Sequence, residues 1–194
     1  MKTFVLASKN KHKAEEIKAI LGDGFDVITQ TEAGAGDIDV IEDGTTFEEN
    51  AIKKAETIMK ATRKPTIADD SGLCVDYLNG APGVYTARYA GENATDGENI
   101  EKLLGALDGV EMSKRAAQFV CVIAFAQPNE ETKVFRGECG GFISNEIKGD
   151  GGFGYDPIFY VEEYDLTMGE LEPQIKNAIS HRSNALKKFV EGIK

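Results

Sequence analysis

The alternation of apolar and polar stretches along the chain predicts strands and helices in the succession typical of an α/β protein. Residues 3–7 (TFVLA) form an apolar run that predicts a buried first strand, and residues 25–28 predict a short second strand. Between them, apolar side chains recur at helical spacing, which predicts a helix that ends near Leu21. The apolar face of this helix consists of Ala14, Ile17, Ile20 and Leu21.

A longer helix is predicted after an acidic, glycine-rich segment at residues 31–43, which we expect to be mostly loop. Thr45 and Thr46 stand before Glu48 and Glu49 at the spacing of a capping box, which marks the start of a helix. Its inward stripe comprises Phe47, Ala51, Ala55, Ile58, Met59 and Thr62, and its polar side comprises Asn50, Lys53, Thr57 and Lys60. The helix is expected to end near Arg63, before Pro65.

One lysine of this helix, Lys54, falls on the inward side. A lysine in that position needs a charged partner or a nearby solvent-filled cleft. The alternative is that its amine extends to water from the edge of the stripe. Of the two neighbouring lysines, Lys54 is therefore the better candidate for binding a ligand.

The second half of the chain predicts a helix, two long strands and a C-terminal helix. Residues 96–107 have an apolar face made of Ile100, Leu103, Leu104 and Leu107. Residues 116–126 and 134–143 are joined by a polar turn at Pro128-Asn129, which predicts an antiparallel hairpin. After Ser180, a good N-cap residue, the last helix directs Leu186, Phe189, Val190 and Ile193 inward.

Composition restricts the class of protein. A chain of 194 residues with 41% hydrophobic and 28% charged content predicts one ordinary globular domain. Its net charge of −11 argues against a protein that coats DNA or RNA, and no apolar run is long enough for a membrane span or a signal peptide. The three cysteines lack metal-binding spacing, so we expect a reducing, cytoplasmic location.

Two adjacent acids, Asp69 and Asp70, are the first candidates for chemistry. They follow the apolar residues 65–68, which predict the end of a buried strand, and precede Ser71 and Gly72, where the chain can turn sharply. Such a position is typical of a metal or general-base site, although a polar turn after an edge strand explains the residues equally well. Adjacent side chains of an extended chain point to opposite faces, so only one of the pair is expected to face a ligand.

Positive charge at the start of two helices conflicts with the helix dipole, which favours anions there. Lys9, Lys11, His12 and Lys13 open the first helix, and His181-Arg182 open the last one. A bound phosphate at these ends would relieve the conflict, whereas in the alternative interpretation the lysines point to water. No Walker A motif is present, so any phosphate cradle is of a different type.

A glycine-rich segment, KGDGGFGYDPIFY, contains Gly149, Gly151 and Gly154 in the pattern GxGxxG. A dinucleotide-binding fold requires a helix directly after this pattern, but Pro157 and a strand-like sequence follow instead, so we reject a nicotinamide-dependent oxidoreductase. Phe153 is either a ring on which a ligand stacks or an ordinary core residue.

Taken together, six segments resemble the inosine/xanthosine triphosphate pyrophosphatases in order and spacing. They are SKNKHK, EDGTTFEENAIKKA, ADDSGL, GAPGVYTARYAG, GGFGYDP and ISHRS, and they cover nearly the whole chain. The resemblance implies an enzyme that hydrolyses ITP, dITP and XTP to the monophosphate and pyrophosphate. A module that only senses nucleotides is disfavoured, because two acids such as Glu42 and Asp70 would weaken the binding of an anion without a metal.

The resemblance also implies a role for each residue of the site. Glu42 and Asp70 would bind Mg²⁺, and Asp70 would accept the proton of the attacking water, which leaves Asp69 as a supporting acid. The triphosphate would be bound by Ser8, Lys9, Asn10, Lys11, His12 and Lys13. The other residues expected to bind substrate are Lys54, Ser71, Phe153, Gly154, Tyr155, Asp156, Lys176, His181 and Arg182, of which the last two would read the base.

The fold implied by the resemblance is an elongated mixed sheet flanked by helices. Residues 1–194 would form a single domain with two lobes and a central cleft. The expected partners are the purine nucleoside triphosphate and a second copy of the chain in a homodimer, with no nucleic acid and no membrane.

Overall fold

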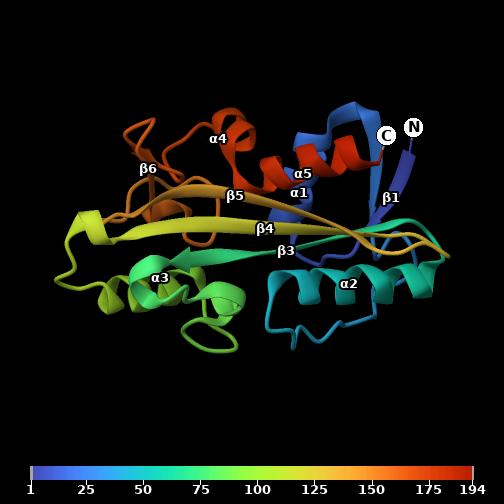
Figure 1. Ribbon diagram of the computed structural model, residues 1–194, viewed down its shortest axis with the longest axis horizontal. Helices are drawn as coiled ribbons and strands as arrows, with labels where there is room; N and C mark the ends of the chain where they lie inside the picture. Colours follow the sequence, from blue (N-terminus) through green and yellow to red (C-terminus); the bar gives the residue numbers. More distant parts are fainter. Residues whose placement is uncertain (1, 194) are drawn as a thin grey trace. The chain divides into compact units, whose positions relative to one another are not determined.

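The computed structural model describes residues 2–193 and is an α/β structure in which all seven strands form a single mixed sheet (Figure 1). The strands are β1 (Lys2–Leu6), β2 (Phe25–Thr29), β3 (Thr66–Val75), β4 (Ala116–Ala126), β5 (Lys133–Ile143), β6 (Phe159–Val161) and β7 (Leu166–Thr167). The α-helices are α1 (Lys11–Leu21), α2 (Phe47–Thr62), α3 (Asp96–Ala106), α4 (Pro173–Ile179) and α5 (His181–Gly192).

The sheet has the strand order β2-β1-β3-β4-β5-β6-β7. β1 runs parallel to both neighbours, with Phe4 opposite Val27 of β2 and Leu6 opposite Ile67 of β3. β6 is antiparallel to β5 and to β7. The short connection at residues 127–132 joins the neighbouring strands β4 and β5, which is the connection that a hairpin requires. The predicted α/β class and the mixed sheet are thus confirmed.

The chain divides into two compact units. Unit 1 comprises Met1–Asp70, Cys121–Gly137 and His181–Lys194, and unit 2 comprises Ser71–Val120 and Glu138–Ser180. The boundary falls inside the motif ADDSGL, between Asp70 and Ser71. Each unit therefore contains part of the residues predicted to bind substrate.

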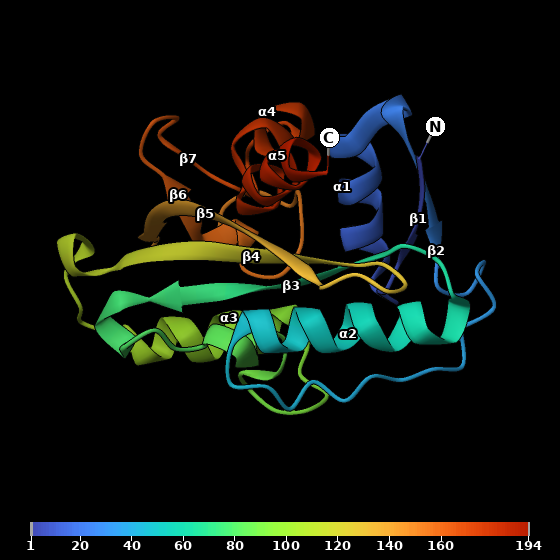
Figure 2. The ribbon, with the colours of Figure 1, turned by 45° about the vertical axis from the view of Figure 1, so that its right-hand side comes forward.

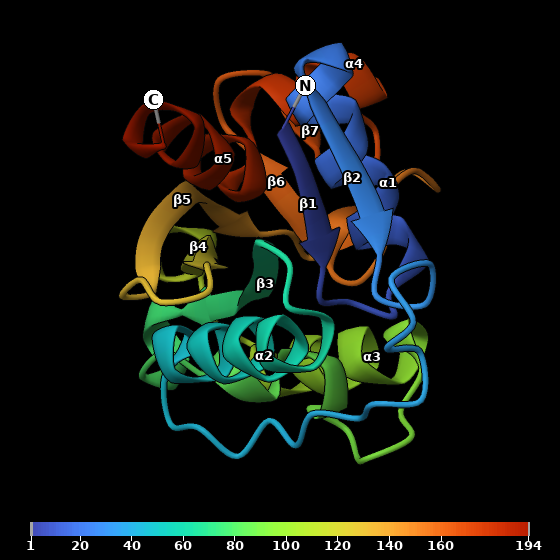
Figure 3. The same cartoon turned by 90° about the vertical axis from the view of Figure 1, so that its right-hand side faces the viewer.

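In unit 1, α1 and α5 lie on one face of the sheet and α2 lies on the other (Figure 2). Figure 3 shows β1 and β2 side by side, with α1 next to them. The apolar face of α5 centres on Phe189, whose ring lies 5.4 Å from Phe125 and 5.6 Å from Phe4 between ring centroids. Gly137 allows α5 to approach β5 closely, because a Cβ atom there would lie 2.2 Å from the backbone nitrogen of Ala185.

In unit 2, α3 packs Ile100 and Leu103 into a core that includes Phe119 and Phe159, whose ring centroids are 4.4 Å apart. A capping box formed by Thr95 and Glu98 fixes the start of α3. The capping box predicted for α2 is also present, between Thr46 and Glu49. The helices predicted from apolar spacing are confirmed within a few residues, whereas the short helix α4 was not predicted.

Two predictions about local structure are wrong. The strand does not end before the acids, because β3 continues through Asp69, Asp70 and Gly72 to the buried residue Val75. The expected turn at Gly72 does not occur, because the strand continues past the glycine and buries Leu73 and Val75 in the core. Asn50 was assigned to the polar side of α2 but is only 1% exposed, since its Oδ1 accepts a hydrogen bond from the Gly44 N–H and anchors the preceding loop.

Within residues 2–193, none of the helices combines the length and the apolar character that crossing a bilayer requires.

Candidate functional site

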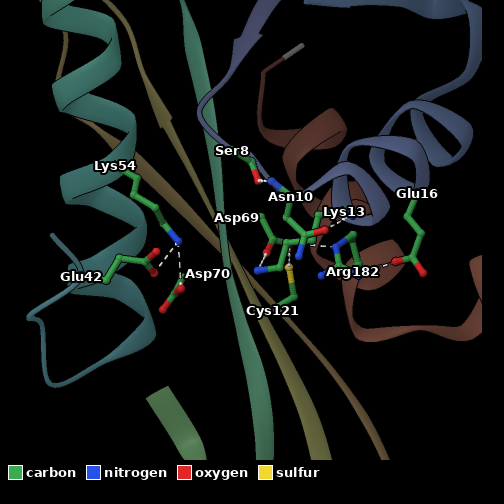
Figure 4. Close-up of polar contacts among 10 residues, drawn as sticks. All are labelled: Ser8, Asn10, Lys13, Glu16, Glu42, Lys54, Asp69, Asp70, Cys121 and Arg182. Atoms are coloured by element: carbon green, nitrogen blue, oxygen red, sulfur yellow. Dashed lines mark hydrogen bonds and ion pairs between the residues drawn. The ribbon is translucent and has the colours of Figure 1, made fainter. Parts of the chain in front are cut away.

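Strand β3 sends the side chains of Asp69 and Asp70 to opposite sides, as its extended backbone requires (Figure 4). Both residues belong to unit 1, and they are 1% and 6% exposed. The hydrogen bonds of the two carboxylates come from different side chains, Lys13, Arg182 and Cys121 for Asp69 and Lys54 for Asp70. The structure therefore separates two acids that are adjacent in sequence into two distinct polar clusters, which we call the Asp70 cluster and the Asp69 cluster.

The Asp70 cluster contains Asp70, Glu42 and Lys54. Lys54 Nζ donates hydrogen bonds to Asp70 Oδ1 at 2.9 Å and to Glu42 Oε2 at 2.8 Å. Lys54 comes from the inward side of α2, as predicted. Glu42 comes from the loop that precedes the capping box at the start of α2. The lysine is 9% exposed and pairs with the buried Asp70 and the half-buried Glu42, so the alternative in which its amine extends to water is wrong.

The electrostatics of the Asp70 cluster differ between its two acids. Burial raises the pKa of Asp70 to about 6, although Lys54 favours the ionised form. Burial also opposes ionisation of Glu42, but there the Lys54 ammonium prevails and the pKa of Glu42 lies below its ordinary value. The pKa of Lys54 is raised, because Asp70 and Glu42 outweigh its own burial. Asp70 is thus a carboxylate that can hold or release a proton near neutral pH.

The donor set of this cluster fits a magnesium ion. Glu42 and Asp70 supply hard carboxylate oxygens, the ligands that Mg²⁺ prefers, and both converge on one cationic centre, the Lys54 ammonium. Residues 2–193 contain no group of three or more His, Cys, Asp or Glu side chains arranged around a common metal position. An ion held by this pair would complete its coordination with water and substrate oxygens, as Mg²⁺ commonly does.

The Asp69 cluster consists of Asp69, Lys13, Arg182, Glu16 and Cys121 (Figure 4). Asp69 Oδ1 accepts from Lys13 Nζ at 2.6 Å, and Oδ2 accepts from Arg182 Nε at 2.8 Å and from Cys121 Sγ at 3.0 Å. Arg182 Nη1 also donates to Glu16. Lys13 and Glu16 both belong to α1, so the chain of alternating charges joins α1, β3 and α5 and returns to α1.

Charge pairing in the Asp69 cluster is strong enough to overcome burial. Burial alone would raise the pKa of Asp69, but Arg182 and Lys13 hold it well below its ordinary value. The pKa of Arg182 is raised, because its partner carboxylate outweighs the cost of burial. Burial and the neighbouring Asp69 raise the pKa of the Cys121 thiol well above its ordinary range. Asp69 is therefore a permanent anion, unsuited to exchange a proton near neutral pH.

The segment Ser8–Lys13 forms the loop before α1 and its first turn. Asn10 caps the helix, since its Oδ1 accepts from the backbone N–H of Lys13, and Ser8 Oγ accepts from the N–H of Asn10. Lys9 pairs at the surface with Asp39. Lys11 and His12 are exposed.

The explanation of the two basic helix starts needs a correction. Two of the cations that were expected to require a bound anion, Lys13 and Arg182, are paired with the protein carboxylate Asp69. The helix dipole argument missed this partner because it considers one helix at a time, whereas Asp69 arrives from β3. His181, which stands beside Arg182, is 6% exposed.

In unit 2, Lys176 and the loop at residues 153–156 lie together. Asp156 Oδ2 accepts from the Phe153 N–H at 2.8 Å and from Lys176 Nζ at 2.7 Å, and Lys176 Nζ lies 5.1 Å from the centroid of the Phe153 ring. Gly152, at φ +74°, brings the loop so close to Asp156 that a Cβ atom there would clash with the carboxylate. The glycine at position 152 thus lets the loop fold back onto Asp156.

The remaining predicted residues of unit 2 differ in how far they are open to a ligand. Phe153 and Gly154 are half-buried, as is Ser71. Tyr155 is 2% exposed, and its hydroxyl donates to the Thr86 carbonyl oxygen at 2.9 Å. Burial raises the pKa of this hydroxyl, so Tyr155 anchors the loop as a neutral group.

Besides Asp39, which pairs with Lys9, sequence reasoning missed three further polar residues that contact the predicted ones. They are Glu16, Cys121 and Asp96, whose Oδ2 accepts from the Gly154 N–H at 2.8 Å. Helical spacing gave a partial signal for Glu16, which follows Lys13 by three residues. Cys121 and Asp96 gave none, because their contacts are made across long sequence separations.

Comparison with known proteins gives a consistent result. The sequence profile of the Ham1 family matches residues 4–192. The chain is 52% identical to the dITP/XTP pyrophosphatase of Bacillus licheniformis, over 97% of this chain and 96% of that protein. It superposes on a solved structure of the Staphylococcus aureus Ham1 protein with a TM-score of 0.87 and 52% identity, covering 100% of both chains. A HAM1 protein from Coxiella burnetii matches with a TM-score of 0.89 and 47% identity, covering 100% of this chain and 98% of that one.

Proposed function

This chain belongs to the Ham1 family, and on that premise we propose that it is a pyrophosphatase that acts on dITP, ITP and XTP. The reaction would release the nucleoside monophosphate and pyrophosphate and so remove non-standard purine nucleotides from the pool. The observation that carries the proposal is the Asp70 cluster, in which a buried carboxylate with a pKa of about 6 adjoins a second carboxylate and a lysine. A general base poised near the working pH is what water activation requires.

In the proposed mechanism, Asp70 accepts a hydrogen bond from the attacking water and orients it toward the α-phosphorus. The carboxylate takes up the proton as the new P–O bond forms, and the bond from the α-phosphorus to the bridging oxygen breaks in line. Pyrophosphate leaves with the electron pair of that bond. Lys54 keeps Asp70 in place and contributes positive charge where negative charge accumulates on the phosphate oxygens.

Mg²⁺ is the cofactor that we propose, held by Glu42 and Asp70. When bound, it would neutralise charge on the phosphate oxygens and help to orient the reacting groups. Lys54, which contacts both carboxylates, would need to share them with the ion or move toward the phosphates.

The triphosphate is assigned to the segment Ser8–Lys13, where exposed cations stand at the N-terminal end of α1. Lys13 is 17% exposed at its side chain, so it can contact an anion while it stays paired with Asp69. We assign the base and sugar to residues 153–156, with Phe153 as the stacking ring and Lys176 beside it.

Base choice would rest on hydrogen-bond donors at the start of α5. Hypoxanthine and xanthine carry a 6-oxo acceptor where adenine carries an amino group, and a buried donor left unpaired penalises adenine. The His181 side chain or nearby backbone N–H groups are the donors that we favour. The Arg182 guanidinium is paired with Asp69 and Glu16, and its side chain is 1% exposed. These contacts do not support direct reading of the base by Arg182, which stays a prediction.

The test is the release of pyrophosphate from dITP, ITP and XTP, measured beside ATP and GTP, with Mg²⁺ and with EDTA. We expect turnover of the first three substrates only with the metal, and much lower kcat/KM for ATP. Activity that persists in EDTA, or equal turnover of ATP, would overturn the proposal. A cytoplasmic location and a homodimer are further parts of it, and light scattering of the purified protein tests the dimer.

A further inference from the structure

Asp96 is an acidic side chain that reaches the backbone of the loop at residues 153–156 from outside that loop. Its Oδ2 accepts from the Gly154 N–H at 2.8 Å, although 58 residues separate the two. We propose that Asp96 is a positioning residue, which holds this loop so that the Phe153 ring is ready to stack on the base. The inference rests on the proposed function in so far as the loop binds the base and sugar.

The position of Asp96 is fixed by the helix that it opens. α3 begins at Asp96 itself, directly after the N-cap Thr95, and its capping box is complete. Three residues further on, Asn99 is 2% exposed and bonds to the backbone of Ala87 and Ala90, while Ile100 is buried in the core. A carboxylate in the first turn is also favoured by the helix dipole. Asp96 is therefore a rigid acceptor, although its side chain is exposed.

Three consecutive residues of the loop, Phe153, Gly154 and Tyr155, are each held by a hydrogen bond. The Phe153 N–H donates to Asp156 and the Gly154 N–H donates to Asp96, so two successive backbone donors are both taken by carboxylates. The Tyr155 hydroxyl is bonded to Thr86. Of these anchors, only the bond to Asp96 restrains Gly154, whose φ of +61° is a conformation that side chains disfavour and that flexible glycine leaves readily.

This arrangement has a chemical consequence. Because the N–H groups of Phe153 and Gly154 are occupied, these two residues offer a ligand the Phe153 ring, beside the Lys176 ammonium, rather than their backbone donors. Loss of the Asp96 carboxylate would free the Gly154 N–H and let the ring adopt several orientations. The substrate would then have to order the loop on binding, which weakens affinity and leaves the chemical step unchanged.

The experiment compares Asp96→Ala and Asp96→Asn with Glu101→Ala as the matched control. Glu101 is an exposed acid of the same helix. We expect Asp96→Ala to raise KM for dITP about tenfold, the effect of one lost charge-assisted hydrogen bond, with kcat within about twofold of wild type. Asp96→Asn keeps an acceptor oxygen and should give an intermediate KM, and Glu101→Ala should match wild type.

A second measurement does not depend on activity. Hydrogen exchange of the Gly154 amide, resolved by NMR, should be at least about tenfold faster in Asp96→Ala than in wild type and in Glu101→Ala, since a protected amide becomes open. Unchanged exchange at Gly154 would overturn the inference, and so would a loss of kcat with unaltered KM. If wild type fails to hydrolyse dITP, ITP and XTP, the proposed function falls, whereas the exchange result still decides whether Asp96 positions the loop.

Discussion

Asp69 and Asp70 are chemically identical neighbours on β3, yet the two sides of the strand give them opposite properties. Asp69 is bonded to two cations and a thiol, and its pKa lies well below the ordinary value. Asp70 shares one lysine with a second carboxylate, and burial raises its pKa to about 6. Both are buried, so burial alone does not explain the difference. The difference lies in the neighbours: two cations are bonded to Asp69, whereas Asp70 has one bonded lysine, shared with Glu42, and the Glu42 carboxylate itself raises the pKa of Asp70.

The comparison shows how one strand can supply a structural acid and a reactive acid at consecutive positions. The Asp69 cluster contains two positive and two negative side chains, so its net charge is zero and each charge has an opposite partner within the cluster. The Asp70 cluster contains two carboxylates and one lysine, and therefore carries an excess of negative charge that a metal ion would balance. We expect the first cluster to govern stability and the second to govern turnover.

The largest effect should come from Asp70→Asn. An amide cannot accept the proton of the attacking water and is a poor ligand for Mg²⁺, so kcat for dITP should fall by at least about 10³-fold. The free energy of unfolding should not decrease, because the ionised form that is lost was itself disfavoured by burial. Steady-state kinetics and urea unfolding measure the two quantities.

Asp76→Asn is the matched control for this prediction, since Asp76 is an exposed aspartate close to the end of the same strand. It should leave both quantities at the wild-type level. The assignment of roles would be reversed if Asp69→Asn abolished kcat while the protein stayed as stable as wild type and Asp70→Asn remained active.

Asp69→Asn should instead act on stability. The substitution leaves Arg182 and Lys13 without the anion that they share, and breaking a buried ion pair in this way costs about 3–5 kcal/mol. Urea unfolding should show a lower midpoint with an unchanged slope. A loss below about 1 kcal/mol would mean that the Asp69 cluster contributes no more to stability than a surface ion pair does, and would contradict its proposed structural role.

The contrast between the two clusters shows how far sequence reasoning reaches. Period-two alternation predicted that Asp69 and Asp70 point to opposite sides, and helical spacing placed Lys54 inward, where it contacts Asp70. These predictions succeeded because they depend on neighbours within one element. The partners of Asp69 come from α1, β4 and α5, up to 113 residues away, and no local pattern encodes such contacts. The same limit explains why Lys13 and Arg182 looked like cations in need of a ligand.

The contributions of Asp69 and Asp70 to the free energy of unfolding should depend on pH in opposite ways, measured in protein freed of metal with EDTA. Asp70 titrates near 6 in the native state and near its ordinary value of 3.8 when unfolded, so the native state binds more protons between these values. Its contribution to stability therefore rises as the pH falls from above 6 toward 4. Asp69 behaves oppositely: its contribution is complete above its ordinary value and is lost only at more acid pH.

Measured between pH 7 and pH 4.5, wild type should gain about 1–2 kcal/mol relative to Asp70→Asn. Because Asp70 interacts with Glu42, the observed midpoint belongs to the pair. Parallel curves for the two proteins over this range would show that Asp70 is ionised near pH 4 like an exposed aspartate, and the electrostatic difference between the clusters would disappear.

The smallest effect concerns Cys121, the third donor to Asp69. Cys121→Val keeps an apolar side chain, slightly larger than the thiol, and removes the donor, whereas Cys121→Ser keeps a donor on a slightly smaller side chain. If the thiol matters as a donor, the valine variant should be less stable than the serine variant by about 0.5–1.5 kcal/mol, the range of a single hydrogen bond. If the valine variant is the more stable one, Cys121 acts as an apolar filler, and Lys13 and Arg182 alone suffice to keep Asp69 ionised.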